Sequence, residues 1–252
     1  MNVYVRELVA SLAQAGSECQ VYVRRWRADL PDEVAVEPGF RVVHIDAGPP
    51  ELPKEQLPDI VDDFTNGVLA HLADHPVDAV HANYWLSGVA GHRIKHELGL
   101  PLVVTFHTLA RVKAETGDPE PQRRIDAETA VIGCSDAICA SCDAEADQLR
   151  RLYGAARERI EVISPGVLHA FFSPGDKAGA RVAVGLGAQP VLLFVGRVQP
   201  LKGLDIAIRT LATIARTDAI LVAVGGPSGR AGNVEFARCR DLVEQLGVGD
   251  RV

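Results

Sequence analysis

The sequence has 252 residues, 47% hydrophobic and 23% charged, the balance of an ordinary globular protein with room for two medium-sized domains. A net charge of -7 argues against a general nucleic-acid-binding protein, which needs a basic face. An anionic ligand would therefore depend on a local cluster of cations. No apolar run approaches the ~20 residues of a membrane span, and no signal peptide opens the chain, so we expect a cytoplasmic protein.

The five cysteines form no even set, as expected for free thiols in a reducing compartment. Cys134, Cys139 and Cys142 have the C-x4-C-x2-C spacing of plant-type iron–sulfur proteins. The remaining candidate ligand, Cys239, lies far along the chain, and the other three fall in an apolar, strand-like stretch. We therefore interpret the cysteines as small buried hydrophobes and predict no metal site.

Hydrophobic spacing predicts a helix over Asn2–Gln14 that ends at Gly16. Short strands follow, and a Pro-rich loop containing Lys54 precedes a second helix. Strands and helices then alternate, which is typical of a doubly wound parallel sheet with right-handed crossovers. We therefore assign residues 1–166 to one α/β domain. Its predicted strands are Cys19–Val23, Arg41–Ile45, Val77–His81, Leu102–Phe106, Ala137–Ala140 and Ile160–Ser164, and its later helices are Ser87–Leu98, Pro121–Thr129 and Asp143–Leu152.

Residues 167–180 are predicted to be a linker, and residues 181–252 to form a second α/β unit. Its first strand, Val191–Val195, is apolar and largely β-branched, which is typical of a strand buried on both faces. Helix-spaced Leu204, Ile208 and Leu211 follow, then a strand over Ala219–Val224 and a helix to about Leu246. Two such domains suit a ligand bound in the cleft between them.

Two cations, Arg197 and Lys202, lie between the Val191–Val195 strand and the next helix. Ligands of parallel α/β sheets bind beyond the carboxyl ends of strands, and helix N-termini favour anions. This placement predicts a clamp for a phosphate-bearing ligand. The alternative is a pair of solvated surface side chains.

Further candidates follow two strands of the N-terminal domain. His81–Gly88 contains a histidine, Tyr84 and Trp85, and Thr105–Leu109 contains another histidine. A histidine at the end of a strand is about as often structural as ligand-binding. For Trp85, packing in the core is the simpler interpretation. Arg123 and Arg124, with Glu128 on the same predicted helix, either pair on a solvated face or aim one guanidinium at a phosphate.

The segment VGRVQPLKG, residues 195–203, resembles the donor-site signature of retaining, family-4 glycosyltransferases of the GT-B fold. Four further motifs are similar to one branch of that family and occur in the same order. They are NVYVREL (2–8), HANYWLSG (81–88), HTLARVK (107–113) and GGPSG (225–229). This branch comprises the D-inositol-3-phosphate glycosyltransferases, with sucrose-phosphate synthases as near relatives, and the similarity runs over essentially the whole chain.

The resemblance implies a role for each matched position. Arg197 and Lys202, beside Gly196, would hold the diphosphate of a nucleotide sugar such as a UDP-sugar, and His107 would contact the donor sugar near the reacting centre. Arg197, Lys202 and His107 would thus form the catalytic group, without a metal or other cofactor. The phosphate of an inositol phosphate or similar acceptor would be held by four residues, Lys54, Tyr84, Thr108 and Arg123, and Asn2 would also contact the acceptor.

The sequence also departs from the family. Members have a β-strand and a Gly-Gly loop directly before the Asn2 helix, and a nucleotide-binding half with a Glu-x7-Glu segment after the position of Val252. We therefore expect Met1 to be an internal methionine of a longer ancestral reading frame. The N-terminal sheet would lack its first strand, the C-terminal domain would be incomplete, and this polypeptide alone would be nearly inactive. Cys134 and Val167–His169 are further departures from the family pattern.

Other functions stay open at this point. A non-catalytic remnant that keeps the phosphate-binding cleft is the main alternative, and a GT-B phosphorylase is a lesser one. A nicotinamide-dependent oxidoreductase is disfavoured because Gly185-Leu186-Gly187 lacks the strand context and third glycine of a dinucleotide-binding loop. The four acceptor residues would recognise phosphate rather than a particular ring, and the sequence leaves a homodimer open.

Overall fold

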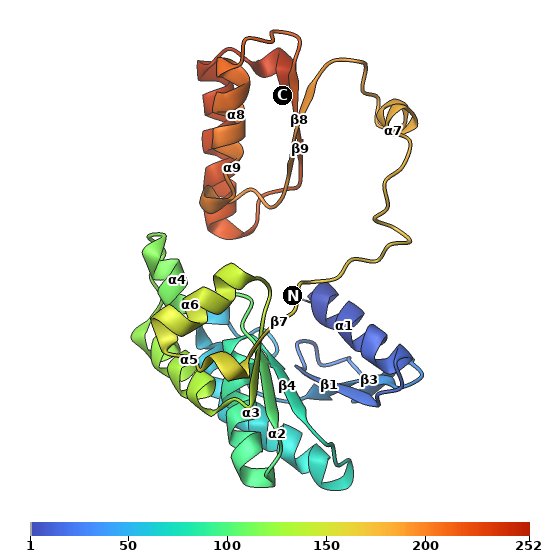
Figure 1. Ribbon diagram of the computed structural model, residues 1–252, viewed down its shortest axis with the longest axis vertical. Helices are drawn as coiled ribbons and strands as arrows, with labels where there is room; N and C mark the ends of the chain where they lie inside the picture. The colour runs from blue at the N-terminus through green and yellow to red at the C-terminus, as the bar shows by residue number, and fades with distance from the viewer. Residues whose placement is uncertain (1) are drawn as a thin grey trace. The chain divides into compact units, whose positions relative to one another are not determined.

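A computed structural model describes residues 2–252, apart from the side chain of Asn2, and divides the chain between Val167 and Leu168 into two units (Figure 1). Both are α/β units, and each is described by itself. Among the described residues, no helix combines the length and apolar character needed to cross a bilayer.

The N-terminal unit opens with the predicted helix α1 (Asn2–Gln14), and Gly16 follows it with a left-handed φ of 96°. A three-stranded sheet of order β1-β3-β2 comes next, with β1 (Cys19–Arg24) parallel to β3 (Phe40–Ile45). The antiparallel strand β2 (Glu33–Glu37) was not predicted. Its valines are exposed and its ends are charged, so it lacks the apolar signal of a core strand.

A second, all-parallel sheet of order β4-β5-β6-β7 forms the larger part of this unit, as the alternation of strands and helices predicts. Its core includes Leu102, Val104 and Ile138, which are completely buried. The elements are η1 (Lys54–Ile60), α2 (Val61–Asp74), β4 (Val80–Asn83), α3 (Trp85–Leu98), β5 (Leu102–Thr105), α4 (Ala110–Glu115), α5 (Gln122–Cys134), β6 (Ala137–Ala140), α6 (Asp143–Tyr153), η2 (Arg157–Arg159) and β7 (Ile160–Val162).

Three local predictions were wrong. The strand β4 begins at Val80 rather than Val77, which places Asn83 at its end. Helix α5 continues past Thr129 because Val131 and Ile132 complete its buried face, so Cys134 ends a helix instead of lying in a strand. Lys54 opens a 3-10 helix rather than lying in an irregular loop.

The strands of the N-terminal unit belong to two sheets instead of one. Among the described residues, β1 and β4 are both edge strands with a neighbour on one side only. The free edges expose backbone hydrogen-bonding groups that a continuous sheet would pair.

The C-terminal unit is smaller and contains a two-stranded parallel sheet of β8 (Val191–Val195) and β9 (Ile220–Val224). Leu204, Ile208, Leu211 and Leu221 form its core with the sheet. The other elements are α7 (Lys177–Ala183), η3 (Pro200–Lys202), α8 (Leu204–Thr213), α9 (Gly229–Gln245) and η4 (Gly249–Arg251).

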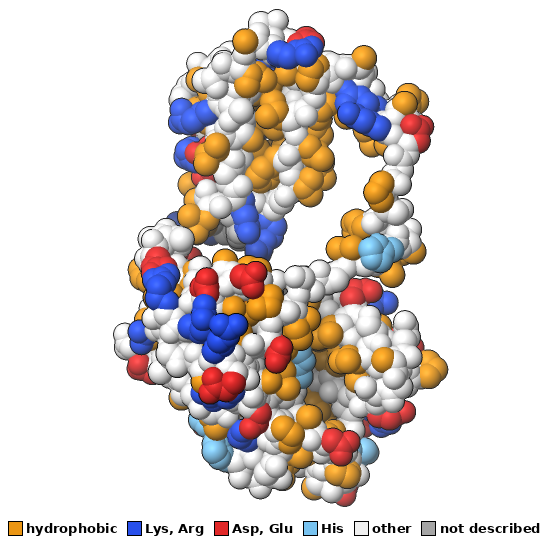
Figure 2. All heavy atoms as spheres, viewed as in Figure 1, with side chains coloured by type: hydrophobic (Ala, Val, Ile, Leu, Met, Phe, Trp, Pro, Cys, Tyr) orange, Lys and Arg blue, Asp and Glu red, His pale blue; other side chains and the backbone are white. Residues whose placement is uncertain are grey.

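The prediction that the Val191–Val195 strand is buried on both faces was wrong. Leu193 and Val195 are 64% and 69% exposed, and Val224 on β9 is 50% exposed. Helices α8 and α9 lie on one side of the sheet (Figure 1), and hydrophobic side chains gather on this unit's visible surface (Figure 2). Among the described residues no layer covers the other face, although the β-branched composition of the strand is that of a fully buried one.

Candidate functional site

Two strained residues mark the carboxyl ends of β4 and β5. Tyr84 has φ 81° and ψ 157°, and His107 has φ 61°; among the described residues they are the non-glycine residues with positive φ. Such conformations cost about 1–3 kcal/mol each and persist where surrounding contacts enforce them. The Tyr84 amide donates to the Thr105 carbonyl at 2.8 Å, and the Tyr84 carbonyl accepts from Gly88 at 2.9 Å. Both strained residues were predicted site residues.

His107 is half-buried and held from two sides. Its Nε2 donates to Asn83 Oδ1 at 3.0 Å, and the Tyr4 ring meets it edge-on with centroids 4.9 Å apart. Burial lowers the pKa of the imidazole below its usual value, so the ring is neutral at neutral pH. With Nε2 carrying the hydrogen, Nδ1 is left as an acceptor for a ligand hydroxyl.

A cavity of about 240 Å³ lies beside His107, at the carboxyl ends of β5, β6 and β7. Its polar groups give it both donors and acceptors for a hydroxyl-rich ligand. The cavity is lined by Tyr4, Thr105, His107, Cys139, Ser141, Glu145, Ile163 and Pro165. His81, the other strand-end histidine, bonds through Nε2 to Thr105 Oγ1 at 2.9 Å, which is a structural contact between β4 and β5.

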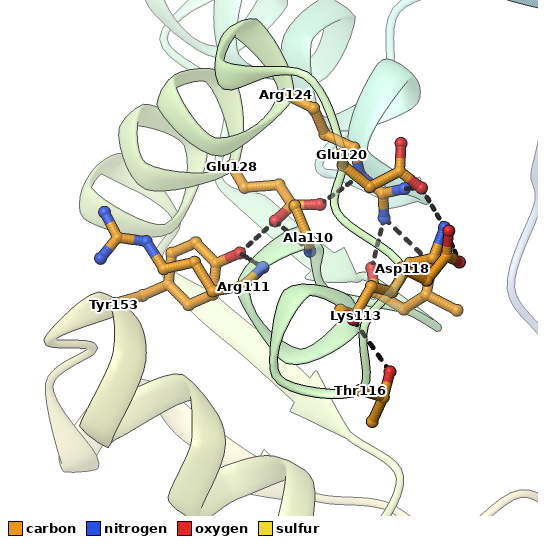
Figure 3. Close-up of polar contacts among 10 residues, drawn as sticks. Ala110, Arg111, Lys113, Thr116, Asp118, Glu120, Arg124, Glu128 and Tyr153 are labelled. Atoms are coloured by element: carbon orange, nitrogen blue, oxygen red, sulfur yellow. Dashed lines mark hydrogen bonds and ion pairs between the residues drawn. The ribbon is translucent and has the colours of Figure 1, made fainter.

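A buried ion pair fixes the loop that carries Thr108 (Figure 3). Arg124 is 2% exposed and Glu128 is 0% exposed, and the Arg124 Nε donates to Glu128 Oε1 at 2.7 Å. The Arg124 Nη2 also donates to the carbonyl and the hydroxyl oxygen of Thr108, at 2.9 and 3.0 Å. The guanidinium therefore sets the position of Thr108 directly.

Glu128 completes the network from the other side. Its Oε2 accepts from the Ala110 amide at 2.9 Å and from the Tyr153 hydroxyl, which in turn accepts from the Arg111 amide at 3.0 Å. Figure 3 shows Glu128 joining α5, the start of α4 and Tyr153 on α6. The predicted alternative of an Arg124–Glu128 pair on a solvated face was wrong, because both side chains are buried.

The Arg124 guanidinium also lies over the ring of Tyr84, 5.2 Å from its centroid, and 5.9 Å from that of Trp85. One buried cation thus touches two predicted site residues, Tyr84 and Thr108, from different strand ends. Trp85 is 8% exposed and packs in the core, which agrees with the plainer reading of that residue.

Arg123 joins the other predicted acceptor residue, Lys54, through the turn that carries it. The Arg123 Nη1 donates to Asp59 Oδ1 at 2.9 Å, and Nη2 donates to the carbonyl of Glu55, the residue after Lys54. Both Arg123 and Lys54 are exposed. The start of α5 and the 3-10 helix η1 are thereby tied together.

In the C-terminal unit, the loop after β8 exposes Arg197 and Lys202. Among the described residues neither side chain has a hydrogen-bond or ion-pair partner within this structure, so both charges face solvent. Gly203, with φ 75°, turns the backbone from η3 into α8. Lys202 lies two residues before the N-terminus of α8, where the helix dipole adds to its positive field.

Close backbone contact holds this loop against the loop after β9. Gly196 and Val198 donate to the carbonyls of Val224 and Gly226, at 3.0 and 2.9 Å. At Gly225 the φ is 140°, and a Cβ there would overlap the Gly196 carbonyl oxygen. Glycine is therefore required at Gly225, and Gly196 marks the end of β8.

The predicted site residues fall into groups. Tyr84 and Thr108 share contacts with Arg124, Arg123 contacts the turn at Lys54, and His107 follows β5; all lie in the N-terminal unit. Gly196, Arg197 and Lys202 lie in the C-terminal unit. The side chain of Asn2 lies outside the described residues.

Sequence reasoning missed the residues that hold the site in place. Asn83 orients His107, and Tyr153 reaches Glu128 from α6. Asn83 carried a signal, because it lies in the HANYWLSG motif and ends a strand of the parallel sheet. Tyr153 carried none, since its partner lies on another helix.

These features define an α/β protein of the GT-B type, with parallel strands whose carboxyl ends carry the candidate groups. The chain belongs to the glycosyl transferase 4-like domain family, whose model matches residues 1–166.

Individual relatives agree with this assignment. The chain is 44% identical to a D-inositol 3-phosphate glycosyltransferase of Acidothermus cellulolyticus and 42% identical to D-inositol 3-phosphate glycosyltransferase 2 of Catenulispora acidiphila, each over 100% of the chain. It spans 59% and 62% of the length of these two relatives.

Solved structures have the same fold. A sucrose-phosphate synthase of Thermosynechococcus elongatus is 28% identical with a TM-score of 0.88, covering 100% of this chain and 63% of that protein. Anabaena HepE, solved with UDP-glucose, is 21% identical with a TM-score of 0.64 over 84% of this chain and 54% of that protein.

Proposed function

We propose that this chain serves the transfer of a sugar from a nucleoside diphosphate sugar, a UDP-sugar, to a phosphorylated polyol such as inositol phosphate. The observation that carries the proposal is the pair of strained residues, Tyr84 and His107, at the ends of adjacent strands. Strain of this kind clusters at ligand sites. The names of the 44% and 42% identical relatives favour the same acceptor.

The N-terminal unit would supply the acceptor groups. A phosphate near Lys54, Tyr84, Thr108 and Arg123 would receive charge-assisted hydrogen bonds from the two cations and neutral ones from the two hydroxyls. Arg123 is already bound to Asp59, so the phosphate would share or replace that carboxylate. Lys54 is exposed and carries no such competitor among the described residues.

The C-terminal unit would supply the donor groups. As the bond from the sugar to the diphosphate breaks, negative charge grows on the leaving group, and Arg197 and Lys202 would neutralise it. Their free charges support this role, because a cation already paired in the protein would have to give up its partner first. In the N-terminal unit, the Nδ1 acceptor of His107 would bind a hydroxyl of the donor sugar.

Calorimetric titration of the full chain with inositol 3-phosphate tests the acceptor half of the proposal. We expect Lys54→Ala and Arg123→Ala each to weaken binding at least about tenfold, since a charge-assisted hydrogen bond contributes ~1.5–3 kcal/mol. The matched control is Arg150→Ala, which removes another exposed, ion-paired arginine of the same unit and should leave affinity unchanged. Unchanged affinity in both site variants, or equally tight binding of inositol without phosphate, would contradict the proposal.

A further inference from the structure

A cluster of metal-ligating side chains lies between α3 and the end of α5, away from the site described above. His92 and His96 are one turn apart on α3, and Cys134 is the last residue of α5. The candidate ligand atoms of all three lie within 4.8 Å of one another. His96 Nε2 is 3.1 Å from Cys134 Sγ, and the two imidazole centroids are 4.9 Å apart.

The backbone beneath the cluster is fixed by tight helix packing. A Cβ at Gly88 would lie 3.0 Å from Val131 Cγ1, so α3 and α5 approach closely at a glycine. Two residues that lie close to the ligands in sequence, Ile94 on α3 and Ile132 on α5, are buried in the core. Asp136 also accepts from Lys95 and, at 2.7 Å, from the Leu102 amide, which fixes the chain just after Cys134. The three ligands are therefore held on rigid elements.

The chemistry of the three groups selects a class of ion. Imidazole nitrogen and thiolate sulfur are the ligands that zinc prefers, at ~2.0–2.1 Å and ~2.3 Å. Tetrahedral binding at these lengths places ligand atoms roughly 3.3–3.6 Å apart. The 3.1 Å between His96 Nε2 and Cys134 Sγ and the 4.8 Å limit for the cluster bracket this spacing.

We propose that His92, His96 and Cys134 bind a zinc ion, with water completing a tetrahedral site. The site lies at the amino end of the sheet, because α3 ends and α5 ends where the chain enters β5 and β6. The strained residues Tyr84 and His107 lie at the opposite, carboxyl end. Zinc here would link two helices of the N-terminal unit and stabilise it, rather than act on the sugar.

A second cluster, Glu33, His71 and His75, also has ligand atoms within 4.8 Å and provides a matched comparison. The side chains of this second cluster already hydrogen-bond or stack with one another or with a neighbouring residue. His71 bonds to the Tyr22 hydroxyl through Nδ1 and to Glu33 through Nε2, each at 3.0 Å, and its ring stacks on that of His75 at 4.1 Å. A metal would have to break these contacts, so this cluster should not compete.

Cobalt titration of the full chain tests the proposal, because Co²⁺ substitutes for zinc and gives a thiolate-to-metal charge-transfer band in the near ultraviolet. We expect that band to saturate at one ion per chain and to disappear when Zn²⁺ is added. Cys134→Ser should abolish it, and His92→Ala and His96→Ala should each weaken binding at least about tenfold. Cys142→Ser and His75→Gln, which leave the three ligands intact, should bind like the wild type.

Zinc should also raise the Tm of the wild type, because an ion that binds the folded state stabilises it, and not that of Cys134→Ser. A circular dichroism spectrum like that of the wild type would show that the variant is folded. Absence of the charge-transfer band in the wild type, its persistence in Cys134→Ser, or its loss in Cys142→Ser or His75→Gln would each overturn the proposal.

Discussion

The loop after β5 in the N-terminal unit and the loop after β8 in the C-terminal unit are held by different physical means. In the first, a buried carboxylate and guanidinium on α5, Glu128 and Arg124, bind the backbone of Ala110 and Thr108. In the second, the described residues show no hydrogen bond from a buried charge to the loop. The backbones of Gly225 and Gly196 meet closely instead, and Arg197 and Lys202 are exposed to solvent.

The difference matches what each loop would have to bind. Neutral groups such as Tyr84, His107 and Thr108, the first two of which have strained backbones, need a rigid support to stay in place, and a buried ion network supplies it. Long cationic side chains that would meet a diphosphate need reach and an unpaired charge instead. The two kinds of support can be broken separately by substitution.

The largest effect is expected from Glu128→Gln. This change removes the completely buried one of the two carboxylates that pair with Arg124 and leaves only the less buried Glu120 as counter-ion. Breaking a buried pair costs about 3–5 kcal/mol of unfolding free energy. Urea unfolding of wild type and variant measures it. Glu115→Gln removes an exposed ion pair with Arg151 and should change stability little. Equal stability of both variants would show that the network does not support the loop.

A smaller effect is expected in the C-terminal unit from Gly225→Ala. The new methyl group would overlap the Gly196 carbonyl, and the left-handed φ alone costs about 1–3 kcal/mol for an alanine. The adjacent change Gly226→Ala is a matched control, because a Cβ there has no atom within 4 Å. Thermal unfolding should separate the two variants; the same Tm for both would contradict the close approach.

The smallest effect is expected from the comparison of Tyr84→Gly with Tyr84→Ala. Both changes remove the ring and its contact with Arg124, but glycine adopts the φ of 81° without strain. Tyr84→Gly should therefore be the more stable variant by about 1 kcal/mol. Chemical denaturation measures this difference, and a glycine variant less stable than the alanine variant would mean that position 84 is not strained.

Much of the fold was predictable because its signal is local. The Leu204, Ile208 and Leu211 spacing gave α8, and the apolar run from Leu102 gave β5. The exposed face of β8 was not predictable. The apolar composition of this strand is typical of a strand covered on both faces, whereas Leu193 and Val195 are exposed here.

For the candidate site, the residues proposed to contact a ligand were predictable, but the residues that support them were not. Strand-end placement and family resemblance pointed to Tyr84, Thr108 and His107, but not to how they are held. An arginine and a glutamate four residues apart, as Arg124 and Glu128 are, look the same in sequence on a buried face and on a solvated one. Which applies depends on α4 and α6 and on the distant Tyr153.

Binding of UDP to the full chain tests the central claim most directly, namely that Arg197 and Lys202 hold the donor diphosphate. Calorimetry should show UDP binding more tightly than uridine, and Arg197→Ala and Lys202→Ala should each weaken UDP binding at least about tenfold. Arg209→Ala and Lys177→Ala, which remove exposed cations of the same unit, should leave it unchanged. Wild-type affinity for UDP in both loop variants would contradict the account.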